Sequence, residues 1–323
     1  MSPLPANIRV TLLLTAPLGL SREAVGAKLL TPGELARLRR ALARHGATLA
    51  DLVPPAGEAL LVALAAGHDT ERLRVLLDRD APLAQALDRW AAQSIWVLDA
   101  TAEGYPTRYT DRLANRAPVL LYGHGPRGTL AAGGLAVVGS RDADGDSLVY
   151  ATEVGARAAA AGVVIISGGA RGIDQTAMLG ALEAGGEAVG VLAEPLERAM
   201  LRANYREHLA DGRLTLVSAN DPGQRFQPGL ARARNRLIYA LADAALVVAT
   251  SHGRGGTWQG AQEALTSLPQ VPLYARAGST SPGLRDLLRA GAQPWPEPTD
   301  PTAWANALTP PPAPIQRTLD FDV

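Results

Sequence analysis

The stretch SGGARGIDQTAMLGALEAGGEAVGVL, residues 167–192, runs from the end of one apolar segment to the end of the next. From about Ile173 its apolar residues have the spacing of a helix, and its last residues form a short apolar run typical of a buried strand. Gly168 and Gly169 stand where the first strand turns into the helix, and glycine permits backbone turns that are closed to other residues. The stretch therefore predicts a strand–helix–strand unit, the building block of parallel sheets.

The same pattern recurs over the chain from Gly134 onward, in six short runs dominated by Val, Ile, Leu and Ala: LAVVGS, VVIISG, EAVGVLA, RLTLVSA, ALVVATS and VPLYARA. These runs are too continuously apolar for strands with one solvated face, and helical stretches separate most of them. Two further strand-like runs, Ile95 to Leu98 and Val119 to Tyr122, precede them. The sequence predicts an α/β fold with a doubly wound, mostly parallel sheet and helices on both faces.

The first part of the chain has a different composition. From Thr31 to about Arg79 apolar residues recur at helical spacing, with Pro-Pro and Gly breaks, which predicts a small all-helical domain over residues 1–80. We interpret its arginine-rich face as a solvated helix surface rather than a second nucleic-acid site. The sheet domain is expected over residues 81–296, and residues 297–323 are expected to form an extended or disordered proline-rich tail.

Composition excludes several classes of protein. The 323 residues include no cysteine, so disulfides, thiolate zinc sites and cysteine nucleophiles are absent, and the five histidines are too scattered for a helical metal site. No apolar run is long enough for a membrane span and the first residues lack the charge pattern of a signal peptide, so we expect a cytoplasmic protein with no membrane partner. Because the formal net charge is zero, any nucleic-acid site must be local.

Ligands of doubly wound sheets bind beyond the carboxyl ends of the strands, so function is expected in the loops that follow them. Ser140 and Arg141 follow the strand LAVVG, and Arg171 stands between glycines before the helix at Ile173. The N–H groups and dipole of that helix favour an anion, and the arginine fork matches phosphate oxygens. The sequence therefore predicts a phosphate site. Asp174 either stabilises the helix dipole or orients an arginine, and we prefer the dipole role.

Two later loops add positive charge. Between Pro222 and Ala242 the chain has four arginines and no acid, with Phe226 among them as a surface for base stacking or, more simply, a buried side chain. The loop from Thr250 to Trp258 adds Arg254 and three glycines. Because neither a GxGxxG fingerprint nor a paired acid and base is present, we expect no NAD, no other cofactor, no metal and no enzymatic activity.

Three segments, AVVGSR, VVIISGGARGIDQTAMLGALEAGG and ARNRLIYALADAALVVAT, resemble in order and spacing the Rossmann-like core of the DprA (Smf) family of DNA-processing proteins. The resemblance covers about residues 90 to 293. It implies an extended Rossmann-like domain that binds single-stranded DNA without sequence preference and loads a RecA-type recombinase in natural transformation. It also implies contact with single-strand-binding protein and a homodimer. The expected DNA-binding residues are Ser140, Arg141, Ser167, Gly168, Gly169, Arg171, Arg232, Arg234, Asn235 and Arg236.

Two alternatives come from other segments. Gly255-Gly256-Thr257 is similar to the PGGxGTxxE loop of the LOG phosphoribohydrolases, although the first acid after it is Glu263; a LOG-like enzyme or a nucleotide-binding sensor is therefore the second hypothesis. The last residues, QRTLDF, are similar to peptides that dock on bacterial sliding clamps. In that hypothesis Gln316, Leu319 and Phe321 would bind the clamp from a flexible tether.

Overall fold

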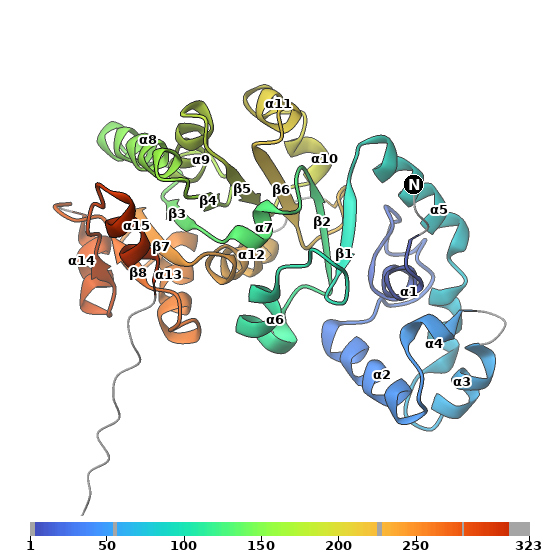
Figure 1. Cartoon of the computed structure of the whole chain (residues 1–323). Helices are drawn as coiled ribbons and strands as arrows, with labels where there is room; N and C mark the ends of the chain where they lie inside the picture. The colour runs from blue at the N-terminus through green and yellow to red at the C-terminus, as the bar shows by residue number, and fades with distance from the viewer. Residues whose placement is uncertain (1–3, 54–56, 225–227, 280, 310–323) are drawn as a thin grey trace, which may run out of the picture.

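The computed structural model describes residues 4–53, 57–224, 228–279 and 281–309 (Figure 1). Within these residues the strands are β1 (Trp96–Asp99), β2 (Leu120–His124), β3 (Leu135–Gly139), β4 (Ile165–Ser167), β5 (Ala188–Val191), β6 (Leu214–Ser218), β7 (Ala244–Ala249), β8 (Leu273–Ala275) and β9 (Gln293–Pro294). The helices are α1 (Ala6–Thr15), α2 (Pro32–Arg44), α3 (Gly57–Leu64), α4 (Thr70–Leu77), α5 (Asp80–Ala92), α6 (Thr107–Leu113), α7 (Thr129–Ala132), α8 (Gly145–Ala160), α9 (Ile173–Glu183), α10 (Leu196–Ala199), α11 (Ala203–Ala210), α12 (Pro228–Leu241), α13 (Gly256–Ser267), α14 (Pro282–Arg289) and α15 (Pro301–Leu308).

All described strands join one sheet in the order β1-β2-β6-β5-β4-β3-β7-β8-β9. The pairs β1–β2 and β2–β6 are antiparallel and the other pairs are parallel, which confirms the predicted mostly parallel α/β sheet. The chain builds outward from β3 through β4, β5 and β6, and then returns to place β7, β8 and β9 on the other side of β3. The topological switch point, where such sheets bind ligands, therefore lies between β3 and β7.

Each central strand is apolar throughout because both faces of the sheet are covered. Leu135 and Val137 of β3 belong to the core under α8 and α9, whereas Ala136 and Val138 belong to the core under α12, α13 and α14. Helices α8 and α9 can pack closely because Gly155 has no side chain; a Cβ there would overlap the backbone of α9. Figure 1 shows these two layers on opposite sides of the strands.

The helices that precede the sheet form a unit at its β1 edge (Figure 1). Helix α1 lies at the centre of this unit, and Ile8 and Val10 to Leu14 are buried. The sequence predicted a helical domain from residue 1 but helical spacing only from Thr31, because the run VTLLL of α1 does not alternate apolar and polar residues. The boundary predicted after residue 80 falls at the start of α5, a helix that contacts α1. At the end of α5, Trp90 packs edge-on against Tyr122 of β2 at 5.2 Å between ring centroids, so the helical unit and the sheet share one core. None of the helices in the described ranges is long and apolar enough to cross a membrane.

The structure corrects the extended tail expected from residue 297. Residues 301–308 form helix α15, which Asp300 caps by accepting a hydrogen bond from the Ala303 N–H at 2.9 Å. Trp304 is 4% exposed and packs edge-on against Trp295, which in turn packs against Tyr274 of β8. The prediction of an extended tail was wrong for these residues. Prolines were interpreted as a sign of disorder, whereas Pro301 occupies the first position of a capped helix.

Replacing Trp304 with Ala should lower the free energy of unfolding by about 3 kcal/mol, because it removes a buried indole and leaves a cavity beside Trp295. Denaturant titration measures this change. Val149→Ala, at a side chain that is 60% exposed, is the control and should shift stability by no more than about 0.5 kcal/mol. Equal small effects of both changes would show that α15 does not stabilise the fold.

Candidate nucleic-acid interface

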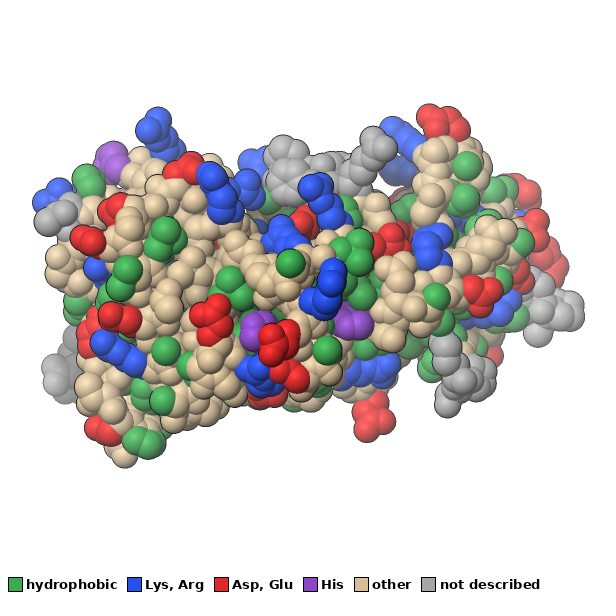
Figure 2. Space-filling view, turned by 90° about the horizontal axis from the view of Figure 1, so that it is seen from above, with side chains coloured by type: hydrophobic (Ala, Val, Ile, Leu, Met, Phe, Trp, Pro, Cys, Tyr) green, Lys and Arg blue, Asp and Glu red, His purple; other side chains and the backbone are tan. Residues whose placement is uncertain are grey.

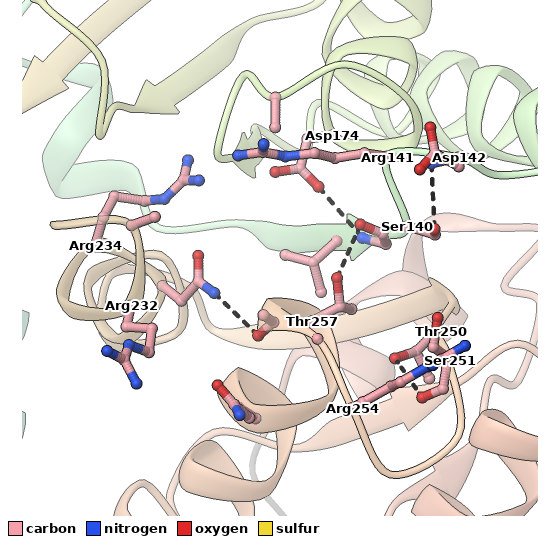
Figure 3. A pocket seen from close by; sticks show the side chains of 18 of the residues that line it. Ser140, Arg141, Asp142, Asp174, Arg232, Arg234, Thr250, Ser251, Arg254 and Thr257 are labelled. Atoms are coloured by element: carbon pink, nitrogen blue, oxygen red, sulfur yellow. Dashed lines mark hydrogen bonds between the residues drawn. The ribbon is translucent and has the colours of Figure 1, made fainter. Parts of the chain in front are cut away.

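A cavity of about 590 Å³ lies at the carboxyl ends of β3 and β7, at the topological switch point. We call it the switch-point pocket. Four segments line it: the loop after β3, the loop after β4 with the start of α9, helix α12, and the loop between β7 and α13 with the start of α13 (Figure 3). Its polar lining residues include Ser140, Arg141, Asp142, Asp174, Arg232, Arg234, Asn235, Thr250, Ser251, Arg254, Thr257 and Gln259.

Hydrogen bonds between three of these segments fix the walls of the pocket. The Thr257 hydroxyl of α13 donates to the carbonyl of Gly139 at 2.9 Å, which ties α13 to the end of β3 (Figure 3). The Asn235 amide of α12 donates to the carbonyl of Gly256 at 3.1 Å and ties α12 to the same loop. Asn235 thus lines the pocket, as predicted, and also positions the loop in front of α13.

Arg234 lies at the base of the pocket and is 6% exposed. Its guanidinium donates to the carbonyls of Gly168 and Val191, the second at 2.8 Å, at the ends of two neighbouring strands. Burial lowers its pKa, and the nearby carboxylate of Asp174 opposes that shift. Arg234, which was expected to bind phosphate, is therefore mainly a buried residue that links the ends of β4 and β5.

Asp174 shares this buried position. It accepts a hydrogen bond from the Gly139 N–H at 3.2 Å. Its pKa is raised above the ordinary value, because the effect of burial exceeds the opposing effects of Arg234 and two backbone N–H groups. Sequence analysis preferred a dipole role over a partner role. The carboxylate accepts a hydrogen bond at the end of β3 and lies close enough to Arg234 for that charge to lower its pKa, so the alternative of an arginine partner describes it better.

Gly168 has a different purpose from the one expected. A Cβ at this position would overlap the Arg234 guanidinium and the Asp174 carboxylate, so the missing side chain makes room for the buried arginine rather than for a ligand. Gly172, at φ +88°, starts α9, and a Cβ there would overlap the carbonyl of Ser140. Ser167 is also buried, and its hydroxyl donates to the carbonyl of Val137 at 2.5 Å within the sheet.

Three arginines present their charge to the pocket from three different segments. Arg141, Arg232 and Arg254 are exposed, and none of them forms an ion pair within the residues that the structure describes. The first turn of α13, from Gly256, adds backbone N–H groups at the pocket wall, and no side chain caps it. Free guanidinium groups around an uncapped helix N-terminus form a site for phosphate.

A second cavity, of about 670 Å³, adjoins the switch-point pocket and shares Arg141, Ala170 and Arg234 with it. Its other lining residues include Arg171, Arg198 and Arg202, and also Glu194, which pairs with Arg202 at 2.7 Å. Arg171 is 77% exposed and forms an ion pair with Asp142, so it lies beside the switch-point pocket rather than in it. Arg198 and Arg202 were missed because only their positive charge, on the segment after β5, pointed to them.

Arg236 lies away from both cavities. Its guanidinium donates to the Glu263 carboxylate at 2.6 Å, and it lines a separate cavity near β2. The pairing also removes Glu263, the carboxylate considered for the LOG-like hypothesis, from the switch-point pocket. Arg225 and Phe226, and the predicted clamp-binding residues Gln316, Leu319 and Phe321, lie outside the described residues.

The surface agrees with a local basic site on a neutral chain. In Figure 2, arginine side chains gather over the middle of one long face, and acidic side chains are scattered among them and toward the ends. A formal net charge of zero is therefore compatible with a local gathering of basic side chains on this face. An uneven surface of this kind can bind a polyanion at one place.

Replacing Gly168 with Ala should destabilise the protein by about 1–3 kcal/mol, because the added methyl group must displace Arg234 or Asp174. Thermal denaturation measures the loss. Gly145→Ala is the matched control, since a Cβ at Gly145 meets no atom within 4 Å. If both variants unfold at the same temperature, the absence of a side chain at position 168 is not needed to accommodate Arg234.

Comparison with known proteins assigns this architecture to a family. The family model "DNA recombination-mediator protein A" matches residues 96–304. The DNA processing protein DprA of Streptococcus pneumoniae is 32% identical over 183 residues, 55% of this chain and 63% of that protein. A putative DNA processing protein DprA of Mycobacterium tuberculosis is 31% identical over 194 residues, 56% of this chain and 48% of that protein. The chain thus spans about half to two thirds of the length of these relatives.

Two solved structures show the same fold. The X-ray structure of DNA processing protein A from Streptococcus pneumoniae superposes with a TM-score of 0.63 at 24% identity, over 86% of this chain and 98% of that one. DNA processing protein A from Helicobacter pylori, a structure described for its binding of single-stranded DNA, superposes with a TM-score of 0.55 at 24% identity, over 66% of this chain and 95% of that one. With a family model that matches well over half of its residues, the chain belongs to the DNA recombination-mediator protein A (DprA/Smf) family.

Proposed function

We propose that this protein binds single-stranded DNA in the switch-point pocket, through phosphate contacts that do not depend on base sequence. The observation that carries the proposal is the convergence of Arg141, Arg232 and Arg254 on one cavity, from two loops and helix α12, beside the N-terminus of α13. A cavity of about 590 Å³ is of the size that encloses a nucleotide-sized ligand. A single strand can enter such a space, whereas a duplex presents only its outer backbone.

The adjoining cavity indicates the path that the bound DNA strand would follow. Because the two cavities share Arg141, a strand held in the switch-point pocket continues past this residue to Arg171, Arg198 and Arg202. These side chains approach from the loops after β4 and β5, next to β3 in the sheet. The strand would thus run across the carboxyl edge of the sheet, with successive phosphates on successive loops.

The wider role in our proposal is that of a recombination mediator. The protein would protect single-stranded DNA, displace single-strand-binding protein and pass the strand to a RecA-type recombinase, acting as a homodimer. Family membership supports this role. Recombinase filament formation on DNA coated with single-strand-binding protein should be faster when this chain is present, and equal rates with and without it would contradict the mediator role.

Arg141→Ala should weaken binding of a labelled single strand by about tenfold at low salt, equally for all sequences, and reduce the salt slope by about 0.7. Fluorescence anisotropy at several salt concentrations measures both quantities. Arg285→Ala, an exposed arginine of α14, is the control and should leave the slope unchanged. Identical curves for both variants would exclude Arg141 from the DNA site.

The LOG-like alternative makes a separate prediction. Glu263 is paired with Arg236 outside the switch-point pocket, and Asp174 is buried and accepts a hydrogen bond from the Gly139 N–H of β3, so neither carboxylate is free to attack a nucleotide. We expect no free base when the protein is incubated with nucleoside monophosphates and the products are separated by chromatography. Sustained release of base that Asp174→Asn abolishes would reverse the assignment.

A further inference from the structure

A second basic cavity lies in the helical unit, far along the chain from the switch-point pocket. It has a volume of about 500 Å³ and lies between α2 and the end of α3. Arg37, Arg40 and Arg44 of α2 line it together with His45 and His68, and the rest of the lining is Ala, Leu and Gly. No carboxylate is part of this lining in the described chain. We call it the helical-unit cavity.

The three arginines are spaced to act together. Positions 37, 40 and 44 differ by three and four residues, so they share one face of α2 and extend over about 10 Å along its axis. That length covers a few successive phosphates of one strand. The apolar side chains of Leu64 and Ala41 lie in the same cavity and leave its charge without an acidic neighbour.

Several carboxylates of the helical unit pair with arginines that do not line the cavity. Glu34, on α2 itself, pairs with Arg72 at 2.9 Å, and this contact lowers the pKa of Glu34 to about 2. The other ion pairs of the unit join Glu58 and Glu71 to Arg74, Asp80 to Arg9, and Asp99 of β1 to Arg39. Among the ion pairs of the described residues, none involves Arg37, Arg40 or Arg44.

The pKa of His68 is affected by the positive charge around the cavity. Its burial, and then the charges of Arg37 and Arg44, lower its pKa, so the imidazole is neutral near pH 7. A solvated helix face explains part of this pattern, because Arg44 in the last turn complements the dipole of α2. That effect is confined to the last turn and does not account for Arg37, or for the cavity into which all three arginines open.

We infer that the helical-unit cavity is a second binding site for the phosphate backbone of DNA, formed by Arg37, Arg40 and Arg44. The identification of the polyanion as DNA rests on the proposed function, whereas the anion site rests on the cavity alone. With no Phe, Tyr or Trp among the described residues of its lining, we expect the site to contact mainly phosphates rather than to stack bases. A strand long enough to reach both sites is therefore held more tightly than a short one.

The test compares three variants of the full chain that each lose three positive charges. Arg37→Gln/Arg40→Gln/Arg44→Gln removes the helical-unit site, and Arg141→Gln/Arg232→Gln/Arg254→Gln removes the switch-point site. Arg22→Gln/Arg206→Gln/Arg285→Gln is the charge-matched control, at exposed arginines that line neither site. Anisotropy is measured with labelled oligothymidine of about 6 and about 40 nucleotides, over a range of salt concentrations.

The helical-unit variant should bind the long strand at least about tenfold more weakly than the control and reduce its salt slope by about 2, which is about 0.7 for each of three phosphates. Its affinity for the short strand should equal that of the control. Long-strand binding equal to that of the control overturns the inference and points to an acidic protein as the ligand. Thermal melting of all three variants verifies folding, and exposed arginines should change it little.

The two proposals fail in different ways. If the switch-point variant loses both strands and the helical-unit variant matches the control, the DNA site of the proposed function stands and the second site is wrong. If the switch-point variant matches the control while the helical-unit variant loses the long strand, the second site stands and the proposed function is wrong.

Discussion

The buried guanidinium of Arg234 is the contact on which the carboxyl edge of the sheet depends. Parallel strands end with carbonyl groups that no further strand satisfies, and Arg234 donates to two of them, at Gly168 and Val191. A buried charge is costly unless a partner offsets it, and Asp174 supplies the opposite charge while holding the end of β3. Glycine at 168 follows from this arrangement, since any side chain there would occupy the volume of the pair.

The inward direction of Arg234 also explains why the neighbouring arginines of α12 have different roles. Residues two apart on a helix point about 200° away from each other, so Arg232 and Arg236 cannot share the direction of Arg234. Arg232 opens to the switch-point pocket and Arg236 pairs with Glu263. One short basic segment thereby provides an exposed arginine of the pocket lining, a buried arginine that links two strand ends, and an ion pair with Glu263.

Positive charge on this neutral chain is available where carboxylates are already engaged. In the helical unit, Glu34 and Asp80 pair with arginines other than those of the helical-unit cavity. At the sheet edge, Asp142 pairs with Arg171 and leaves Arg141 free. The distribution of ion pairs, more than the number of basic residues, determines which surfaces can attract a polyanion.

The sequence alone determined the strands, the parallel sheet and the loops that hold the site, because strands buried on both faces are continuously apolar and their turns carry glycine. It also predicted Arg141 and Arg232 as DNA-binding residues, and both line the switch-point pocket, whereas their contact with DNA stays a prediction. Only the tertiary structure decided which arginines are free. Burial of Arg234, the pairing of Arg236 with Glu263 and the anchoring of α15 by Trp304 depend on partners distant in the sequence, and no local pattern specifies them.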